Sequence, residues 1–265
     1  MVERTARPGN YAEQARTYDL TRGASPTVVL AVAPFLGAGG GRLLLDVAGG
    51  TGNYARAFQA RGFRVLVVDA EPAMLRRAVL KVGAGCVVNG DAVALPFADG
   101  SVDCATMVNA VHLVEDPLRA FREIRRVMRE GPFCFTGFAK ENLAALFVYE
   151  YFGLDAPPTR RPSIAQFEAL LHDAGLTRVV HEPYVYTDTA DGSLNALHTD
   201  AKRLADPDVL RNTSFWHALD EETRERGLQA LARDLRSGAL EERVRRSSRD
   251  AARHGHGTLF AAWPR

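Results

Sequence analysis

The chain has 265 residues, of which 46% are hydrophobic and 25% are charged, a composition typical of a globular protein. Its 33 basic and 32 acidic side chains give a formal net charge of +1, which argues against a nucleic-acid binder because such proteins need excess positive charge to displace counterions. We therefore expect a small-molecule partner and no nucleic acid.

The sequence also argues against secretion and membrane insertion. The stretch MVERTARPGN carries charges where a signal peptide needs an apolar core, and no apolar run approaches the roughly 18 residues of a membrane span. Cys86, Cys104 and Cys134 form no C-x-x-C pair, and each lies in a segment that we expect to be a buried strand. We expect a cytoplasmic protein with reduced thiols and no membrane contact, for which a homodimer is a possible assembly.

The order of segments along the chain predicts an N-terminal addition, a core and an insertion. Residues 1–40 are expected to form a helical segment that covers the entry to a binding site. Residues 41–187 alternate apolar runs with amphipathic stretches, which is the pattern of βαβ units in a parallel sheet. Residues 188–255 are expected to be helices inserted on the acceptor side before the final strand, 256–265.

The core is predicted to be a Rossmann-like, doubly wound α/β fold with a mostly parallel sheet of seven strands. The strands are expected at residues 42–47, 63–69, 86–91, 102–109, 132–138, 177–186 and 257–263. The helices between them are expected at residues 53–60, from Pro72 onward, at 116–131 and at 163–175. Because most of these strands are continuous apolar runs, helices should cover both faces of the sheet.

The loop after the first strand is the first candidate site. In LLLDVAGGTGNYARAF, residues 43–58, three glycines stand between a strand and a helix, where the turn needs φ > 0 or a ligand must approach the main chain closely. A nucleoside triphosphate is excluded because the Lys of a Walker A loop is absent. A nicotinamide dinucleotide stays open, since Gly50, Gly52 and Ala55 satisfy G-x-G-x-x-G/A and Asp69 ends the next strand.

Two further acidic residues favour a cofactor without a pyrophosphate. Asp46 ends the first strand directly before the glycines, where its carboxylate would repel a pyrophosphate but would suit a cationic sulfonium with a free amino group. Asp91, in GDAVALPFADGSVD, could accept a hydrogen bond from an exocyclic adenine amine.

Four stretches together carry a family resemblance: LLLDVAGGTG, VVDAEPAML, GDAVALPFADGSVD and VHLVEDPLRAFREIRRVM. They resemble the successive motifs of class I S-adenosylmethionine-dependent methyltransferases, in particular the group similar to ubiquinone and menaquinone biosynthesis enzymes. The resemblance covers about residues 11–138. It implies S-adenosyl-L-methionine as cofactor and S-adenosyl-L-homocysteine as product. The chain departs from the family pattern at Ala48, where the first glycine of the loop usually stands.

The resemblance also implies which residues hold the cofactor. Asp46, Gly49, Gly50 and Gly52 would surround the methionine part, Asp69 would hold the ribose, Asp91 and Ala92 would recognise adenine, and Met74 would pack on its face. The Asn109 backbone would lie near the amino end, and Ala48 and Ala70 would line the same site. From the stretch YAEQARTYDLTRG, which resembles the family's entry helix, Tyr11, Tyr18 or Arg22 would close over the cofactor, with Arg22 pairing with its carboxylate.

Each of these assignments has a structural alternative. The three aspartates could simply form turns at strand ends, and Met74 could belong to the core between helix and sheet. Tyr11, Tyr18 and Arg22 could belong to an amphipathic helix packed on the domain.

The histidines offer one candidate for chemistry. His112 follows the fourth strand at the edge where parallel sheets bind ligands, so it is the candidate catalytic base, with a hydrogen-bonded structural role as the alternative. His254 and His256 form an H-x-H pair without a third ligand, which favours a polar turn, and we expect no metal site.

The acceptor site is expected in the variable segments, because the core is committed to the cofactor. LFVYEYF, residues 146–152, and TSFWHAL, residues 213–219, could line a cavity or form the core that joins the insertion to the main domain, and Phe152 and Phe215 fit the core better. The arginine-rich run at 240–254 contains interspersed acids and is expected to be a solvated helix face.

These observations predict an enzyme that transfers a methyl group from S-adenosylmethionine to a small molecule, expected to be a bacterial secondary metabolite or a quinone-like compound. Three alternatives stay open: an S-adenosylmethionine-binding enzyme with another reaction such as cyclisation, a nicotinamide-dependent oxidoreductase, and a silent binding module. The Tyr-x-x-x-Lys pair of common short-chain reductases is absent from the sequence.

Overall fold

The structure is a computed structural model that describes residues 11–154 and 161–264. The first ten residues of the expected N-terminal segment, and the last residue of the expected final strand segment, therefore lie outside the described residues.

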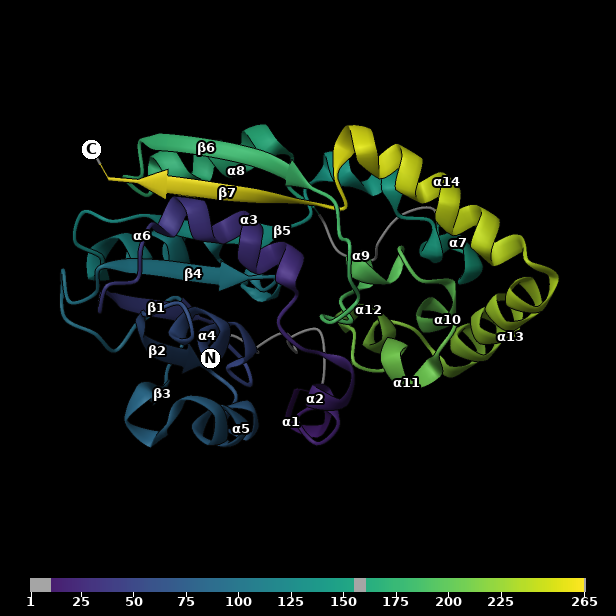
Figure 1. Cartoon of the computed structure of the whole chain (residues 1–265), viewed down its shortest axis with the longest axis horizontal. Helices are drawn as coiled ribbons and strands as arrows, with labels where there is room; N and C mark the ends of the chain where they lie inside the picture. The colour runs from purple at the N-terminus through teal and green to yellow at the C-terminus, as the bar shows by residue number, and fades with distance from the viewer. Residues whose placement is uncertain (1–10, 155–160, 265) are drawn as a thin grey trace, which may run out of the picture.

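A seven-stranded sheet with the order β3-β2-β1-β4-β5-β7-β6 forms the core (Figure 1). Its strands are β1 (Leu43–Val47), β2 (Arg64–Asp69), β3 (Val87–Asn89), β4 (Cys104–Val108), β5 (Phe133–Gly137), β6 (Arg178–Tyr184) and β7 (Gly257–Trp263). The first five strands are parallel, whereas β7 runs antiparallel between β5 and β6. The predicted fold class and all seven strands are confirmed, with ends that differ by a few residues.

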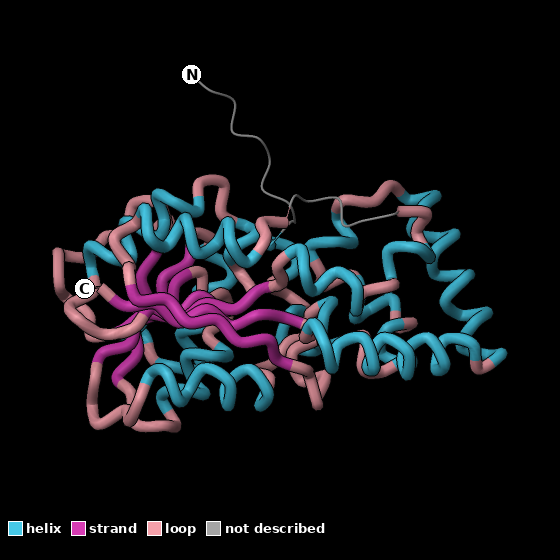
Figure 2. The backbone as a smooth tube through the Cα atoms, turned by 90° about the horizontal axis from the view of Figure 1, so that it is seen from above, coloured by secondary structure: helices cyan, strands magenta, loops and turns pink. Residues whose placement is uncertain are grey.

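Helices cover both faces of this sheet (Figure 2). On one face, α6 (Pro117–Val127) and α8 (Ile164–Asp173) bury apolar residues such as Phe121 and Phe167 against the strands. On the other face lie α3 (Pro26–Leu36), α4 (Asn53–Gln59) and α5 (Pro72–Val82). The expected helix starts are confirmed by caps: the side chain of Asp116 accepts from the Arg119 N–H, and Ser163 forms a capping box with Gln166.

Short helices and two long ones form a unit beyond the carboxyl ends of the parallel strands (Figure 1). They are α7 (Val148–Tyr151), α9 (Leu194–Leu197), α10 (Ala201–Leu204), α11 (Pro207–Leu210), α12 (Ser214–His217), α13 (Glu221–Ser237) and α14 (Ala239–His254). We call this unit the helical cap. It has an apolar cluster of its own, in which Phe152 is 1% exposed. Residue 227 must be glycine because a Cβ there would lie 2.2 Å from the Phe152 ring.

Helices α9 to α14 lie between residues 188 and 255, and α14, which contains the arginine-rich run, is largely exposed. The N-terminal helices α1 (Tyr11–Gln14) and α2 (Tyr18–Thr21) lie at the junction of the sheet domain and the cap (Figure 1).

The cysteine prediction is correct for two positions and wrong for one. Cys104 and Cys134 are buried in β4 and β5, but Cys86 lies in the short 3-10 helix η1 (Ala84–Cys86) and is half-buried. The reason is that β3 begins one residue later than expected, after the turn at Gly83. All three thiols are free. None of the helices in the described ranges is long and apolar enough to cross a membrane.

Candidate active site

A cavity of about 580 Å³ lies between the carboxyl ends of the parallel strands, the N-terminal helices and the helical cap. This position is where open parallel sheets bind ligands, beside β1 and β4, from which the sheet grows in opposite directions. The structure brings together nearly all the residues expected from the sequence. The cavity is lined by Tyr11, Tyr18, Arg22, Asp46, Ala48, Gly49, Gly50, Asp69, Ala70, Met74, Asp91, Ala92, Asn109 and His112.

The turn after β1 is built from left-handed backbone. Ala48 has φ = 53° and Gly50 has φ = 55°, so an alanine adopts the conformation for which the family pattern has a glycine. Gly50 lines the cavity, and a Cβ at this position would meet no atom within 4 Å. Gly52 is different: it does not line the cavity, and its φ of 76° and close approach to Ala78 let α4 pack on α5. Gly52 is thus needed for helix packing, and its expected place around the methionine part stays a prediction.

Asp46 is a buried carboxylic acid at the wall of the cavity. Its side chain accepts a hydrogen bond of 2.9 Å from the Thr106 hydroxyl through Oδ1, while Oδ2 is buried and has no hydrogen-bond partner within the described residues. Burial, together with the nearby charge of Asp69, raises the pKa of Asp46 to about 7, although the hydrogen bond from Thr106 opposes this shift. A cation bound here would favour the ionised form of Asp46.

Asp69 holds the glycine turn in shape. Its Oδ2 accepts from the Gly50 N–H at 2.9 Å and its Oδ1 accepts from the Glu71 N–H at 2.8 Å. A carboxylate has about four lone-pair sites in all, and Asp69 also lines the cavity. Met74 lines the cavity and is 2% exposed, which places it in the core and at the cavity wall at once.

Asp91 lies at the far end of this wall. The Val93 N–H donates to its Oδ1 at 3.3 Å, and Asp91 forms a backbone bridge with Ala94. The carboxylate therefore organises a turn and also lines the cavity.

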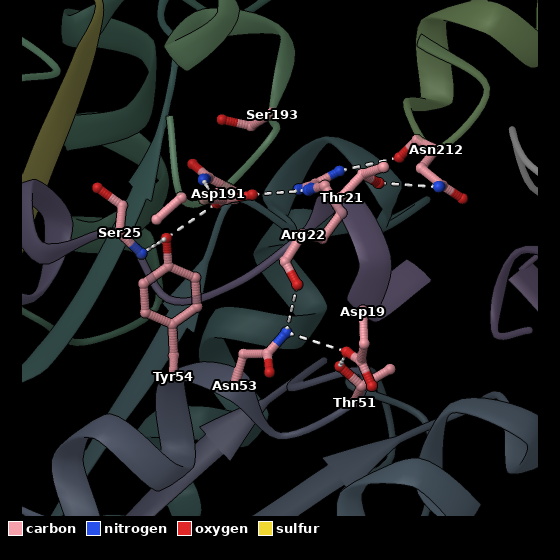
Figure 3. A network of polar contacts seen from close by, with 12 residues as sticks. Asp19, Thr21, Arg22, Ser25, Thr51, Asn53, Tyr54, Asp191, Ser193 and Asn212 are labelled. Carbon is pink, nitrogen blue, oxygen red and sulfur yellow. Dashed lines mark hydrogen bonds and ion pairs between the residues drawn. The ribbon is translucent and has the colours of Figure 1, made fainter. Parts of the chain in front are cut away.

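A buried carboxylate that the sequence did not single out joins the segments around the cavity (Figure 3). Asp191 is 1% exposed, and its Oδ1 accepts from Arg22 Nε at 2.6 Å. Its Oδ2 accepts from the Tyr54 hydroxyl at 2.8 Å and from Asn109 Nδ2 at 2.9 Å. In the sequence, Asp191 is an acidic residue directly before Gly192, and this pair is typical of an ordinary turn.

Arg22 is consequently committed to the protein. Besides its ion pair with Asp191, its Nη1 donates to the Asn212 carbonyl at 3.0 Å, and its guanidinium lies 5.0 Å from the centre of the Tyr18 ring. Asp191 neutralises its charge, so the expected pairing with a cofactor carboxylate would have to compete with this contact.

A second polar cluster fastens α2 to the glycine turn (Figure 3). Asp19 accepts from the Thr51 hydroxyl at 2.6 Å and from Lys81 Nζ at 2.7 Å. Lys81 also donates to Asn53 Oδ1 at 2.6 Å. The N-terminal segment is thus linked to both walls of the cavity.

His112 lines the cavity from the 3-10 helix η2 (Val111–Leu113), which follows β4. Its Nε2 lies 3.3 Å from the hydroxyl of Ser214, at the start of α12 in the cap. Burial, followed by the positive charges of Arg161 and Arg22, lowers the pKa of His112 to about 3. The imidazole is therefore neutral at physiological pH and can form hydrogen bonds in either direction.

The cap contributes a second wall, in which aromatic and aliphatic side chains lie among polar ones such as Ser193, Asn195 and Ser214. Tyr149, Leu194 and Phe215 line it, together with Phe138 from the end of β5 and the charged Arg161. Phe215 is also packed against Phe152 in the cap's own cluster, so it serves as both core and cavity wall, whereas Phe152 belongs to the core alone.

Two other histidines, His256 and His198, form hydrogen bonds that hold the fold together. His256 is buried and its Nδ1 accepts from the Tyr186 N–H at 3.1 Å, which fixes the start of β7 against the end of β6. His198 Nε2 accepts from the N–H groups of Phe147 and Val148 at the start of α7. Within residues 11–154 and 161–264, no group of three or more metal-ligating side chains is present.

Comparisons with known proteins agree with this site. Residues 45–136 match the family described as "Methyltransferase domain". An uncharacterized methyltransferase of Mycobacterium sp. (strain JLS) is 40% identical over 92 residues, which are 35% of this chain and 36% of the relative. A demethylmenaquinone methyltransferase of Thermobifida fusca (strain YX) is 40% identical over 96 residues, which are 34% of this chain and 41% of the relative. The chain thus covers less than half the length of these curated relatives.

The fold as a whole is similar to a solved structure from Anabaena variabilis ATCC 29413, described as a candidate methyltransferase from an antibiotic biosynthesis pathway. The TM-score is 0.77 and the identity 23%, over 92% of this chain and 99% of that chain. At 23% identity, this similarity shows a shared fold and nothing more. Together with the matching segment, it confirms the resemblance based on the four motifs: residues 45–136 belong to a class I S-adenosylmethionine-dependent methyltransferase domain.

Proposed function

We propose that the whole chain transfers a methyl group from S-adenosylmethionine to a small molecule bound between the glycine turn and the helical cap. The observation that carries this proposal is the cavity itself, which has the acidic, glycine-lined wall of the methyltransferase domain on one side and a wall of aromatic, aliphatic and polar side chains from the cap on the other.

The residues present fit this cofactor. The unpartnered Oδ2 of Asp46 is a buried acceptor for the cofactor's cationic groups, and Gly50 leaves open space where a side chain would block the approach to the main chain. Asp69 and Asp91 would accept from the ribose hydroxyls and the adenine amine, and Met74 would pack on the adenine ring. When bound, S-adenosylmethionine supplies a methyl group activated by a sulfonium.

The chain's own contribution is alignment and exclusion of water. Methyl transfer from a sulfonium is an in-line displacement, which a protein accelerates by holding the reactants in register in a water-poor site. The ion pair between Arg22 and Asp191 and the contacts of Asp19 close the cavity on the N-terminal side. The cap closes the opposite side and sets which acceptors fit.

His112 would act as a neutral hydrogen-bond partner of the acceptor. An imidazole whose pKa is lowered to about 3 is a weak base, so it suits an acceptor whose nucleophile is already deprotonated or acidic. Its contact with Ser214 would fix the ring toward the acceptor side. The expected secondary metabolite or quinone-like compound remains the proposed class, supported by the aromatic cap wall and by the descriptions of the relatives from Thermobifida and Anabaena.

Calorimetric titration with S-adenosylmethionine, S-adenosylhomocysteine and NADH tests the proposal first. We expect micromolar binding of the first two and none of NADH. Incubation with labelled S-adenosylmethionine and a panel of phenols, amines and enols should then give a methylated product. Cofactor binding without transfer to any acceptor would favour a non-methylating reaction such as cyclisation, and NADH binding alone would overturn the proposal.

A further inference from the structure

Arg161 is a cation at the acceptor wall that the proposed transfer reaction does not use. It immediately precedes the turn to α8 and lines the cavity with Phe138 and Tyr149. Burial lowers the pKa of Arg161 to about 10, which is still far above neutral pH, so the guanidinium is charged where it lies.

Within residues 11–154 and 161–264, this cation has no carboxylate partner. Arg22 pairs with Asp191 at 2.6 Å and Arg126 with Glu123 at 2.7 Å, but Arg161 forms no ion pair with a residue of the described chain. Its Nε is buried without a hydrogen-bond partner there. A half-buried charge without a carboxylate partner is costly, so its position beside a cavity points to a ligand that completes it.

The orientation of the guanidinium suits an oxyanion. Its central carbon lies 3.8 Å from the centre of the Phe138 ring. A guanidinium held on an aromatic face keeps its N–H groups at its edge, where they can donate in pairs to a carboxylate or a phosphate. Tyr149 in α7 also helps to hold the guanidinium in place, because its hydroxyl accepts a hydrogen bond from Arg161.

We propose that the acceptor carries an oxyanion, as a carboxylate or a phosphate, on an apolar body, and that Arg161 binds this group. The assignment rests on the proposed function, because it names the acceptor class of the same cavity. Leu194 and Phe215 would contact the apolar body, and the oxyanion would anchor it beside His112. The acidic groups Asp46, Asp69 and Asp91 line the cofactor side of the cavity, where they would repel such an acid.

Calorimetry with simple probes tests this assignment. The full chain, saturated with S-adenosylhomocysteine, is titrated with trans-cinnamate, with its neutral analogue cinnamamide and with phenyl phosphate. The wild type should bind one of the two anions at least about tenfold more tightly than the amide, as expected for charge-assisted hydrogen bonds. Comparing cinnamate with phenyl phosphate separates a carboxylate site from a phosphate site. Equal binding of acid and amide, or no binding of any probe, would overturn the proposal.

Two variants and a control assign the preference to this residue. Arg161→Gln should abolish the preference for the anion, and Arg161→Lys should keep part of it, because a point charge cannot donate in the paired geometry. Arg233→Gln removes an exposed arginine from α13 and should change nothing. A preference that survives in Arg161→Gln overturns the proposal. If Arg161→Gln does not fold, Arg161→Lys is used in its place. A preference for the anion that is as strong in Arg161→Lys as in the wild type then overturns the proposal.

Binding of S-adenosylhomocysteine distinguishes a role of Arg161 at the acceptor from a role at the cofactor. All variants should bind S-adenosylhomocysteine as the wild type does. If Arg161→Gln weakens that binding tenfold while the preference for the anionic probe persists, Arg161 serves the cofactor and the assignment fails. Repeating the titrations without S-adenosylhomocysteine keeps the test valid even if the methyltransferase proposal is wrong, since anion binding at Arg161 is then measured by itself.

Discussion

The two walls of the cavity are built in different ways. The cofactor wall comes from the stretch between Asp46 and His112, in which Asp46, Asp69 and Asp91 lie at the ends of parallel strands or just beyond them. The acceptor wall is assembled from Tyr149, Arg161 and Phe215, which lie on segments far apart in the sequence and meet only when the cap folds. The first wall is a local property of strand-turn-helix units, whereas the second depends on long-range packing.

The largest effect should come from breaking the link between the walls. Asp191→Ala would leave Arg22 buried without its partner and remove acceptors from Tyr54 and Asn109, so we expect the free energy of unfolding to fall by about 3–5 kcal/mol. Urea unfolding measures the change. Asp250→Ala, an exposed acid on α14, is the matched control and should stay within about 0.5 kcal/mol of the wild type. A loss below about 1 kcal/mol in Asp191→Ala would contradict the linking role.

The next effect concerns the cofactor wall alone. Asp69→Ala would leave the N–H groups of Gly50 and Glu71 without their acceptor, and would remove the proposed ribose ligand. We expect S-adenosylhomocysteine affinity to fall by about a hundredfold, in line with two lost charge-assisted hydrogen bonds. Calorimetry measures this affinity. The near-isosteric variant Asp69→Asn should have an affinity between those of the wild type and Asp69→Ala. Unchanged affinity in Asp69→Ala would remove the residue from the binding site.

The raised pKa of Asp46 predicts that the stability of the protein depends on pH. Since burial raises the pKa of Asp46 from 3.8 to about 7, the folded protein without ligand keeps a proton that the unfolded chain has lost. Stability should therefore fall as the pH rises from about 4 to about 7 and level off above it, and Asp46→Asn should remove this fall.

The same ionisation should act on ligand binding. The ratio of S-adenosylmethionine affinity to S-adenosylhomocysteine affinity should rise as the pH passes about 7, because the ionised Asp46 attracts the sulfonium. Calorimetry at pH 6 and pH 8 measures the ratio. A ratio that rises equally in Asp46→Asn would show that another group is responsible.

The smallest effect tests the glycine turn. Ala48→Gly should stabilise the protein by about 1 kcal/mol, because a left-handed φ of 53° strains an alanine but not a glycine. In the exposed part of α14, Ala252→Gly should instead destabilise by about 1 kcal/mol. Thermal unfolding of both variants measures the difference, and a change of the same sign in both would contradict the strain.

The difference between the walls also explains how far the sequence could be interpreted. The seven strands and the positions of Asp46, Asp69 and Asp91 followed from local patterns, because a residue that ends a parallel strand must lie at one edge of the sheet. Sequence cannot tell a glycine needed for helix packing, such as Gly52, from one needed only for ligand approach.

The roles of Asp191 and Arg161 had no local signal. Asp191 acquires its importance from contacts with residues 22, 54 and 109, and Arg161 from its stacking on Phe138 and the lack of a nearby carboxylate in the described structure. Such roles depend on which segments meet, and a single sequence does not state this.

The register of the last two strands has a consequence for how such an enzyme diversifies. Tyr184 ends β6 directly opposite Gly257 at the start of β7, and the His256 N–H donates to the Tyr184 carbonyl at 2.8 Å. The inserted helices thus leave and rejoin the sheet at adjacent backbone positions, where a tight hairpin would suffice. A segment exchanged there, in evolution or in the laboratory, would change the proposed acceptor wall while the sheet is kept, provided that it again supplied a carboxylate for Arg22, Tyr54 and Asn109.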